Sequence, residues 1–324
     1  IPIEDLEVNM PNLLSHTLLV KRFYLKEEKS IDSSNTFLRS NYEFLSMGTQ
    51  GPDPLFYVGL LPSHGLHLLT ANKRIGNAIH KSDAKKYFKL LIDRSYGLED
   101  DRNRARFQSF IFGQLAHYLL DRETHPYILY VSGFGDDGRI SGKYHYLHAN
   151  FESNIDVCLA KKYKMNFFLE NPADALPKEK DFLYIIDKEM VPVLSQLFGY
   201  DKLPKHMYTN SMMNMSSVIA FMNRNSGWKK KLFPKRITGI CMPDPQHLEW
   251  EDCLNEKKEV WLDPVTGAKH NESFLELHNR AYEILQSCYQ DILKYGFNYE
   301  VVSKYLNGLN YYGTPIGSKF VYKK

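Results

Sequence analysis

Side chains that suit a metal ion recur at four-residue steps in one stretch of the sequence. His117, Asp121 and His125 follow one another at this spacing. In a helix, residues four apart lie one above the other on the same face. The rest of this stretch is largely apolar, and a buried carboxylate or imidazole is costly unless it is paired or bound to a metal. The spacing therefore predicts a metal-binding face.

A second pair with the same spacing lies in the next helical stretch, at His148 and Glu152. If the two helices lie side by side, five ligands converge on one cleft. Imidazole nitrogen and carboxylate oxygen are the ligands of catalytic zinc, which keeps one position open for water. One isolated pair of this kind is usually a surface hydrogen bond or a weak ion pair. The repetition of the step favours a metal.

Three further residues are candidates, each with a simpler alternative. His16 lies among leucines and is, taken alone, typical of a hydrogen-bonded core histidine. His80 precedes a predicted helix, where a loop histidine is the alternative, and His64 and His67 compete with it. Asp53 lies in a Gly-Pro-Asp-Pro segment, where it is also typical of a turn.

Apolar residues at helical spacing dominate the sequence and predict a mainly α protein. We expect a helix to begin near residue 84, with Ser82 as its N-cap. A long helix from about residue 107 is expected to end near His125, because Pro126 cannot continue the hydrogen-bond ladder. The other predicted helices cover residues 13–23, 146–163, 182–198, 211–222 and 274–295. Residues 237–241 and 259–262 are the best strand candidates, and 48–57 and 132–143 read as loops.

These elements predict one multi-helix domain. We expect residues 10–170 to form a metal-binding helical catalytic core. Residues 171–324 would form a helical C-terminal half packed on the same domain, with an irregular insertion at about 224–271.

Composition narrows the function classes. The 324 residues are 43% hydrophobic and 24% charged, which is ordinary for a globular protein. A net charge of +3 is too small to favour nucleic acid as a partner. No apolar run reaches the roughly 18 residues that a membrane span needs. The acidic beginning lacks a secretion signal and predicts a cytoplasmic protein, although a signal removed during maturation would leave no trace.

Several ordered pieces resemble one known family. They are Asn12-Leu-Leu-Ser-His16, Gly51-Pro-Asp53, His80 followed by Tyr87-Phe-Lys-Leu, His117-Tyr-Leu-Leu-Asp121-Arg-Glu-Thr-His125-Pro, and His148-Ala-Asn-Phe-Glu152. Over about residues 10 to 160, the chain resembles the zinc-dependent phospholipase C family. That family forms one all-α superfamily with the single-strand-specific nucleases.

The resemblance implies up to three zinc ions. It would assign one zinc to His80, His117 and Asp121, with Asp121 bridging to a second zinc that also takes His16.

The third zinc would be bound by His125, His148 and Glu152, and Asp53 would be a further ligand or the general base. In the family, the second metal also takes the amino group and carbonyl of an N-terminal Trp. No Trp lies near Ile1, so we expect the zinc of His16 to be weak or absent.

The expected activity is metal-dependent phosphodiester hydrolysis. Two close cations bind the phosphoryl oxygens and lower the pKa of a bridging water, and the metal-bound hydroxide attacks phosphorus. Phospholipids are the first expectation for the substrate, although Pro54 follows Asp53 and no choline head-group site is recognisable. Nucleotides or nucleic acids are the alternative substrates. The competing class is a non-catalytic helical module with structural zinc.

Overall fold

Helices built on the apolar stripes of the sequence make up most of the structure, so the mainly α expectation is confirmed. The computed structural model describes residues 13–27, 37–38, 41–59, 75–165, 171–176, 180–200, 203–224 and 226–324. Asn12, His64 and His67 lie outside these ranges. The first helices are α1 (Leu13–Glu27), α2 (Tyr42–Gly48), the 3-10 helix η2 (Asp53–Tyr57), α3 (Ile75–Lys81), α4 (Ala84–Tyr96), α5 (Asp101–Ser132) and α6 (Lys143–Lys162).

The second half of the chain contains shorter helices and one small hairpin. Its elements are the 3-10 helix η5 (Pro172–Ala175), α8 (Lys180–Phe198), α9 (Met207–Asn223), α10 (Ser226–Leu232), α11 (Lys235–Thr238), β1 (Trp261–Leu262), β2 (Lys269–His270), α12 (Phe274–Tyr295) and α13 (Tyr299–Ser303). The strands pair antiparallel, with Trp261 opposite His270. The strand predicted at 259–262 is thus confirmed in part. The one predicted at 237–241 is wrong, because α11 covers its first residues and a turn follows.

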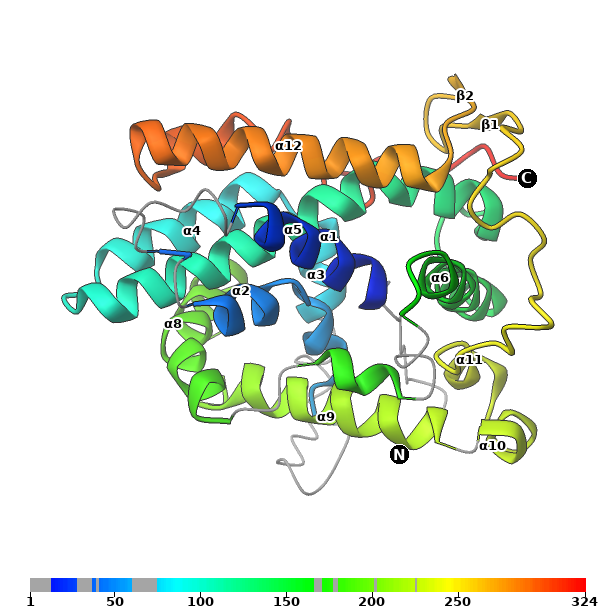
Figure 1. Cartoon of the computed structure of the whole chain (residues 1–324), viewed down its shortest axis with the longest axis horizontal. Helices are drawn as coiled ribbons and strands as arrows, with labels where there is room; N and C mark the ends of the chain where they lie inside the picture. The colour runs from blue at the N-terminus through cyan, green and yellow to red at the C-terminus, as the bar shows by residue number, and fades with distance from the viewer. Residues whose placement is uncertain are drawn as a thin grey trace.

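The long helix α5 runs through the middle of the molecule (Figure 1). It contacts α1, α2, α4, α6 and α12, and α12 lies along its length in Figure 1. From Phe107 to Asp121, all but one residue of α5 are buried. A helix that is buried on every side lies at the centre of the molecule. The candidate ligands on α5 are therefore held by a rigid, fully packed element.

Helix α5 continues through Pro126 to Ser132, so the expected end at His125 is wrong. The residues on both sides of the proline are buried, and Tyr127 adds a hydrogen bond from its hydroxyl to the Cys253 carbonyl at 3.1 Å. Burial of the helical turn after Pro126 outweighs the one backbone hydrogen bond that the proline cannot donate. Gly313 lies against it with φ +69°, and a Cβ there would be 2.3 Å from the Arg122 carbonyl oxygen.

Side chains cap the N-termini of α4 and α12. The α4 cap is Asp83, whose carboxylate accepts a hydrogen bond from the Lys85 N–H at 2.9 Å, so the expectation of Ser82 is wrong by one residue. At α12, Ser273 and Glu276 form a complete capping box.

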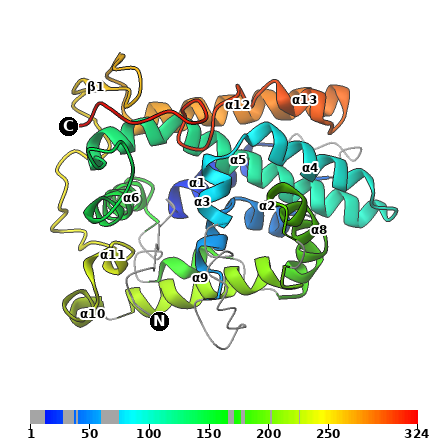
Figure 2. The same ribbon diagram turned by 180° about the vertical axis from the view of Figure 1, so that it is seen from behind.

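The C-terminal segment returns across α5 and ends near β1 (Figure 2). The Tyr118 hydroxyl donates to the Leu309 carbonyl at 2.9 Å, and the Tyr311 N–H donates to the His80 carbonyl at 3.2 Å. The main hydrophobic core combines residues of α1, α5, α9 and α12, so both halves of the chain contribute to it. None of the described helices is both long and apolar enough to cross a membrane.

Candidate metal centre

The structure brings all eight candidate residues together in three groups. Within each group, one ligand atom per residue lies within 4.8 Å of the others. The groups are His16, His117 and Asp121; Asp53, His80 and His117; and His125, His148 and Glu152. Every member is buried, with an exposed fraction of at most 5%. Helices α1, η2, α3, α5 and α6 supply them.

His117 belongs to the first two groups and joins them. Its Nε2 lies 3.1 Å from Asp121 Oδ2 and 3.5 Å from Asp53 Oδ2. His16 Nε2 is 3.2 Å from Asp121 Oδ1, and His80 Nε2 is 3.1 Å from Asp53 Oδ1. Two carboxylates and three imidazoles therefore form two adjacent buried groups that have His117 in common.

The third group lies one turn along α5. His125 Nε2 and His148 Nε2 lie 3.5 Å and 3.3 Å from Glu152 Oε1. The two imidazole rings are nearly parallel, with centroids 5.4 Å apart. His125 also connects the groups, because its Nδ1 is 3.7 Å from Asp121 Oδ2. The side-by-side helices expected from the sequence are thus present, but the ligands separate into distinct groups.

Three histidines are oriented by backbone carbonyls behind them. The Nδ1 atoms of His80, His117 and His125 lie 2.8, 2.9 and 3.0 Å from the carbonyl oxygens of Gly76, Thr49 and Tyr311. A proton on Nδ1 makes this bond and leaves the Nε2 lone pair facing the carboxylates. This is the arrangement that fixes the tautomer of metal-bound histidine.

His80 is held by an element that the sequence did not reveal. It lies in the last turn of α3, so the loop alternative is wrong. Gly51 performs a related task for His117. It has φ +54°, and a Cβ at this position would lie 2.3 Å from the His117 ring. Only glycine lets the segment before η2 approach the ring this closely.

Asp156 is a positioning residue that sequence reasoning missed. Its buried carboxylate accepts hydrogen bonds from the backbone N–H groups of Leu14 and Ser15 at 3.0 and 3.1 Å, and from the Ser15 hydroxyl at 2.8 Å. It thereby holds the beginning of α1, and with it His16, against α6. The signal was present, because Asp156 continues the four-residue step of His148 and Glu152.

The charges in the groups shift one another's pKa values. Burial alone would lower the pKa of His117 and His125, but the nearby carboxylates outweigh it and raise both pKa values to about 9. Burial would raise the pKa of Asp121, yet His125 and His117 hold it well below its usual range. Burial and the neighbouring His117 lower the pKa of His16. The groups therefore interact strongly as one electrostatic unit.

Unsatisfied atoms within the groups test whether a metal fits. His117 Nε2, Asp53 Oδ2 and Glu152 Oε2 are buried and have no hydrogen-bond partner among the described residues. The distances around His117 are those of an ion pair, without the directions of a hydrogen bond. A buried polar atom without a partner is expensive. Imidazole nitrogens and carboxylate oxygens that face one another with no hydrogen bond fit a cation such as zinc.

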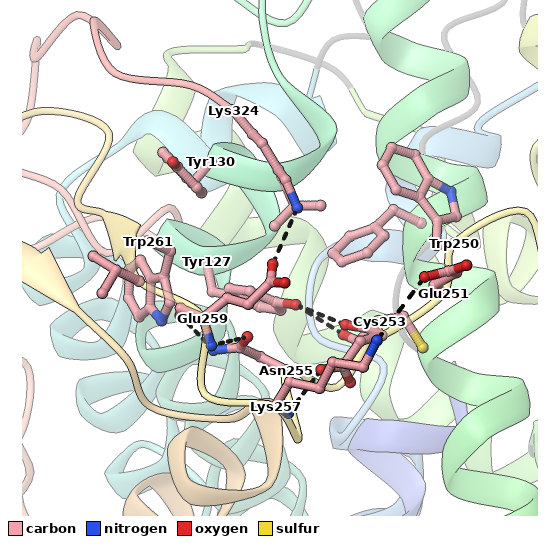
Figure 3. Close-up of a pocket in the computed structure, with 14 residues that line it drawn as sticks. Tyr127, Tyr130, Trp250, Glu251, Cys253, Asn255, Lys257, Glu259, Trp261 and Lys324 are labelled. Atoms are coloured by element: carbon pink, nitrogen blue, oxygen red, sulfur yellow. Dashed lines mark hydrogen bonds and ion pairs between the residues drawn. The ribbon is translucent and has the colours of Figure 1, made fainter.

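A pocket drawn in Figure 3 is not part of this centre. It has a volume of about 170 Å³, and none of the eight candidate ligands is among the described residues that line it. Trp250, Trp261 and Tyr127 form aromatic parts of its wall. Its two lysines lie beside acidic partners: Lys324 Nζ is 3.5 Å from Glu259 Oε2, and Lys257 Nζ is 3.9 Å from Glu251 Oε2.

Compared with models of known protein families, with curated proteins and with solved structures, the chain matches none.

Proposed function

We propose that this protein is a zinc-dependent phosphodiester hydrolase of the phospholipase C type. The observation that supports it most is the chain of three buried histidine–carboxylate groups joined through His117 and Asp121. A module with one structural zinc needs a single closed set of four ligands. Neighbouring ligand groups with a carboxylate between them are typical of phosphoesterases that use two close metal ions.

Each candidate ligand would bind the cation of the group in which it lies. His16, His80, His117, Asp53 and Asp121 would hold two neighbouring cations, and Asp121 is placed to lie between positive charges. When bound, such cations bind phosphoryl oxygens and make a water molecule more acidic.

His125, His148 and Glu152 would hold a third cation beside this pair. The carbonyls behind His80, His117 and His125 keep the imidazoles aligned through a reaction, so little reorganisation is needed as charge develops on the phosphate.

Phospholipids are the substrate class that we favour, and nucleotides are the alternative. The resemblance of residues 10–160 to the phospholipase C family supports a phosphodiester, and the small net charge of +3 disfavours long nucleic acid.

A matched pair of histidine variants tests the proposal. His125→Ala removes a member of the third group. His247→Ala removes an exposed histidine that also faces a carboxylate, with Nδ1 3.1 Å from Asp244 Oδ2. We expect His125→Ala to lower both the zinc content and the cleavage of a chromogenic phosphodiester, and His247→Ala to change neither. Equal behaviour of the two variants, or no cleavage by zinc-loaded wild-type protein, would contradict the proposal.

A further inference from the structure

A larger pocket, with a volume of about 490 Å³, lies against the candidate metal centre. Tyr312 lines it, and the Tyr312 ring centroid is 5.4 Å from that of His125 and 6.2 Å from that of His80. Lys81, which directly follows His80, also lines it, as does His145, one turn before His148. The pocket therefore lies beside the metal groups, where the part of a substrate that adjoins a bound phosphodiester would fit.

The pocket is positively charged. Lys81, Arg139 and Lys319 line it and are exposed, and no acidic side chain is among the described residues of its wall. None of these three cations forms an ion pair with another described side chain. His145 comes from the first turn of α6, so the positive end of that helix dipole adds to the field. The pocket of Figure 3 differs, because its lysines lie beside glutamates.

The walls come from three parts of the chain that only the fold brings together. Lys81 ends α3, Arg139 lies in the connection between α5 and α6, and Lys319 lies in the C-terminal segment. The Phe320 N–H lies 3.5 Å from the Gly138 carbonyl oxygen, which links the last two parts. The Tyr312 and Phe320 rings, with centroids 5.9 Å apart, form an apolar side. This geometry suits a group that carries negative charge at one end.

We propose that this pocket binds a phosphomonoester group carried by the substrate next to the phosphodiester that is cleaved. The inference rests on the proposed hydrolase function and deepens it. A phosphomonoester has close to two negative charges at neutral pH and accepts charge-assisted hydrogen bonds from Lys and Arg. A cationic head group would instead meet three like charges. Two kinds of substrate carry a phosphomonoester: a lipid with a phosphorylated polyol head group, and a nucleotide with a terminal phosphate.

Two pairs of substrates distinguish these sources. One pair is phosphatidylinositol with and without a 4-phosphate, in detergent micelles. The other is a dinucleotide with and without a terminal phosphate. We expect kcat/KM to be about tenfold higher for the phosphorylated member of one pair, which corresponds to one strong charge-assisted contact. The preference should shrink as salt is added, because the cations are exposed.

Variants locate the preference in the pocket. In Lys319→Ala the ratio of the two kcat/KM values should fall by roughly threefold to tenfold, and in Lys319→Glu further, since exposed contacts are individually modest. The matched control is Lys188→Ala, which removes an exposed lysine of α8, a helix with no described residue in the wall of the pocket. It should leave the ratio unchanged. A ratio near one in both pairs, in protein that cleaves the unphosphorylated members, would overturn this inference and leave the hydrolase function intact.

If no member of either pair is cleaved, the hydrolase function fails, and a binding measurement still decides the role of the pocket. Inorganic phosphate is titrated into the wild-type protein and into the Arg139→Ala variant in a calorimeter. We expect the variant to bind phosphate more weakly. Equal affinity, or no binding to either protein, would overturn the inference.

Discussion

Asp121 lies among four histidines. Its carboxylate oxygens are 3.2 Å from His16 Nε2, 3.1 Å from His117 Nε2, and 3.7 Å from both His80 Nε2 and His125 Nδ1. Positive charges that lie this close to one carboxylate also lie close to one another, and they repel strongly unless an anion lies between them. Asp121 therefore stabilises positive charge on its side of the site, as Asp53 does between His80 and His117, whether the charge is on imidazolium groups or on metal ions.

We therefore expect Asp121→Asn to lose more than one zinc ion per chain. The amide keeps the shape and removes the charge that lets neighbouring cations coexist. Elemental analysis of the purified variant measures the loss, and hydrolysis should fall with it. Asp244→Asn, at an exposed aspartate that also faces a histidine, is the control. Full zinc content in Asp121→Asn would show that Asp121 is not a shared ligand.

The structure favours a ligand role for Asp53 over that of a general base. Its two oxygens lie 3.1 and 3.5 Å from the Nε2 atoms of His80 and His117. We expect Asp53→Asn to lose zinc and activity together. Retained zinc with turnover reduced by roughly 10²–10⁴-fold would instead assign it as the base. Zinc analysis and a rate measurement on one preparation separate the two roles.

At the residue scale, spacing in the sequence predicted which residues belong to the candidate site better than it predicted how they separate into three groups. The four-residue steps located His117, Asp121, His125, His148 and Glu152 because a helix repeats its face. The separation into groups depends on how α1, α3 and η2 approach α5, which no local pattern encodes. Asp156 continues the four-residue step of His148 and Glu152, but its partner, the beginning of α1, is distant in sequence and no local pattern indicates it.

At the scale of the elements, the contact between α1 and α6 is where a substitution tests most directly what positions His16. Asp156→Ala leaves the Leu14 and Ser15 N–H groups buried without acceptors. The free energy of unfolding of the metal-free protein should fall by about 1–3 kcal/mol. Urea unfolding measures this. Asp93→Ala, at an exposed ion pair with Lys89, should change it by less than about 0.5 kcal/mol. Equal small effects would mean that the junction does not depend on Asp156.

The elements themselves were largely predictable, with informative exceptions. Apolar periodicity located α1, α5, α6, α8, α9 and α12, because apolar residues of each helix pack into the core. Helix α3 is only seven residues long, too short to show a period. The end of α5 was wrong because a proline rule that holds for isolated helices is overridden when the following turn, with Tyr127, is buried. Tertiary contacts decided both cases.

For the whole molecule, the C-terminal segment was the least predictable part. It has no periodic apolar pattern, yet the Tyr311 carbonyl oxygen lies 3.0 Å from His125 Nδ1, and the Tyr312 ring both packs against the His125 ring and lines the positively charged pocket. Residues far from the candidate ligands in sequence complete their surroundings. Only the complete fold reveals this, because the contacts join positions nearly two hundred residues apart.

The stability of the whole molecule should depend on pH in opposite ways with and without zinc. Without metal, the pKa values of His117 and His125 are raised to about 9, against about 6.5 when unfolded. Their contribution is complete below pH 6.5 and is lost as the pH rises through 9. Zinc requires neutral imidazole, so its binding strengthens over the same range. The increase in Tm on adding zinc should therefore grow between pH 6.5 and 9. A constant or shrinking increase would contradict histidine ligation.

The most direct test follows hydrolysis as zinc is returned to chelated wild-type protein. Zinc bound per chain and the rate of cleavage of a chromogenic phosphodiester are measured at each addition. We predict that the rate is negligible without metal, rises as zinc is bound and stops rising at no more than three ions per chain. Protein that binds no zinc, or that binds its full complement and cleaves no phosphodiester, would contradict the assignment of this site as a metal-dependent hydrolase.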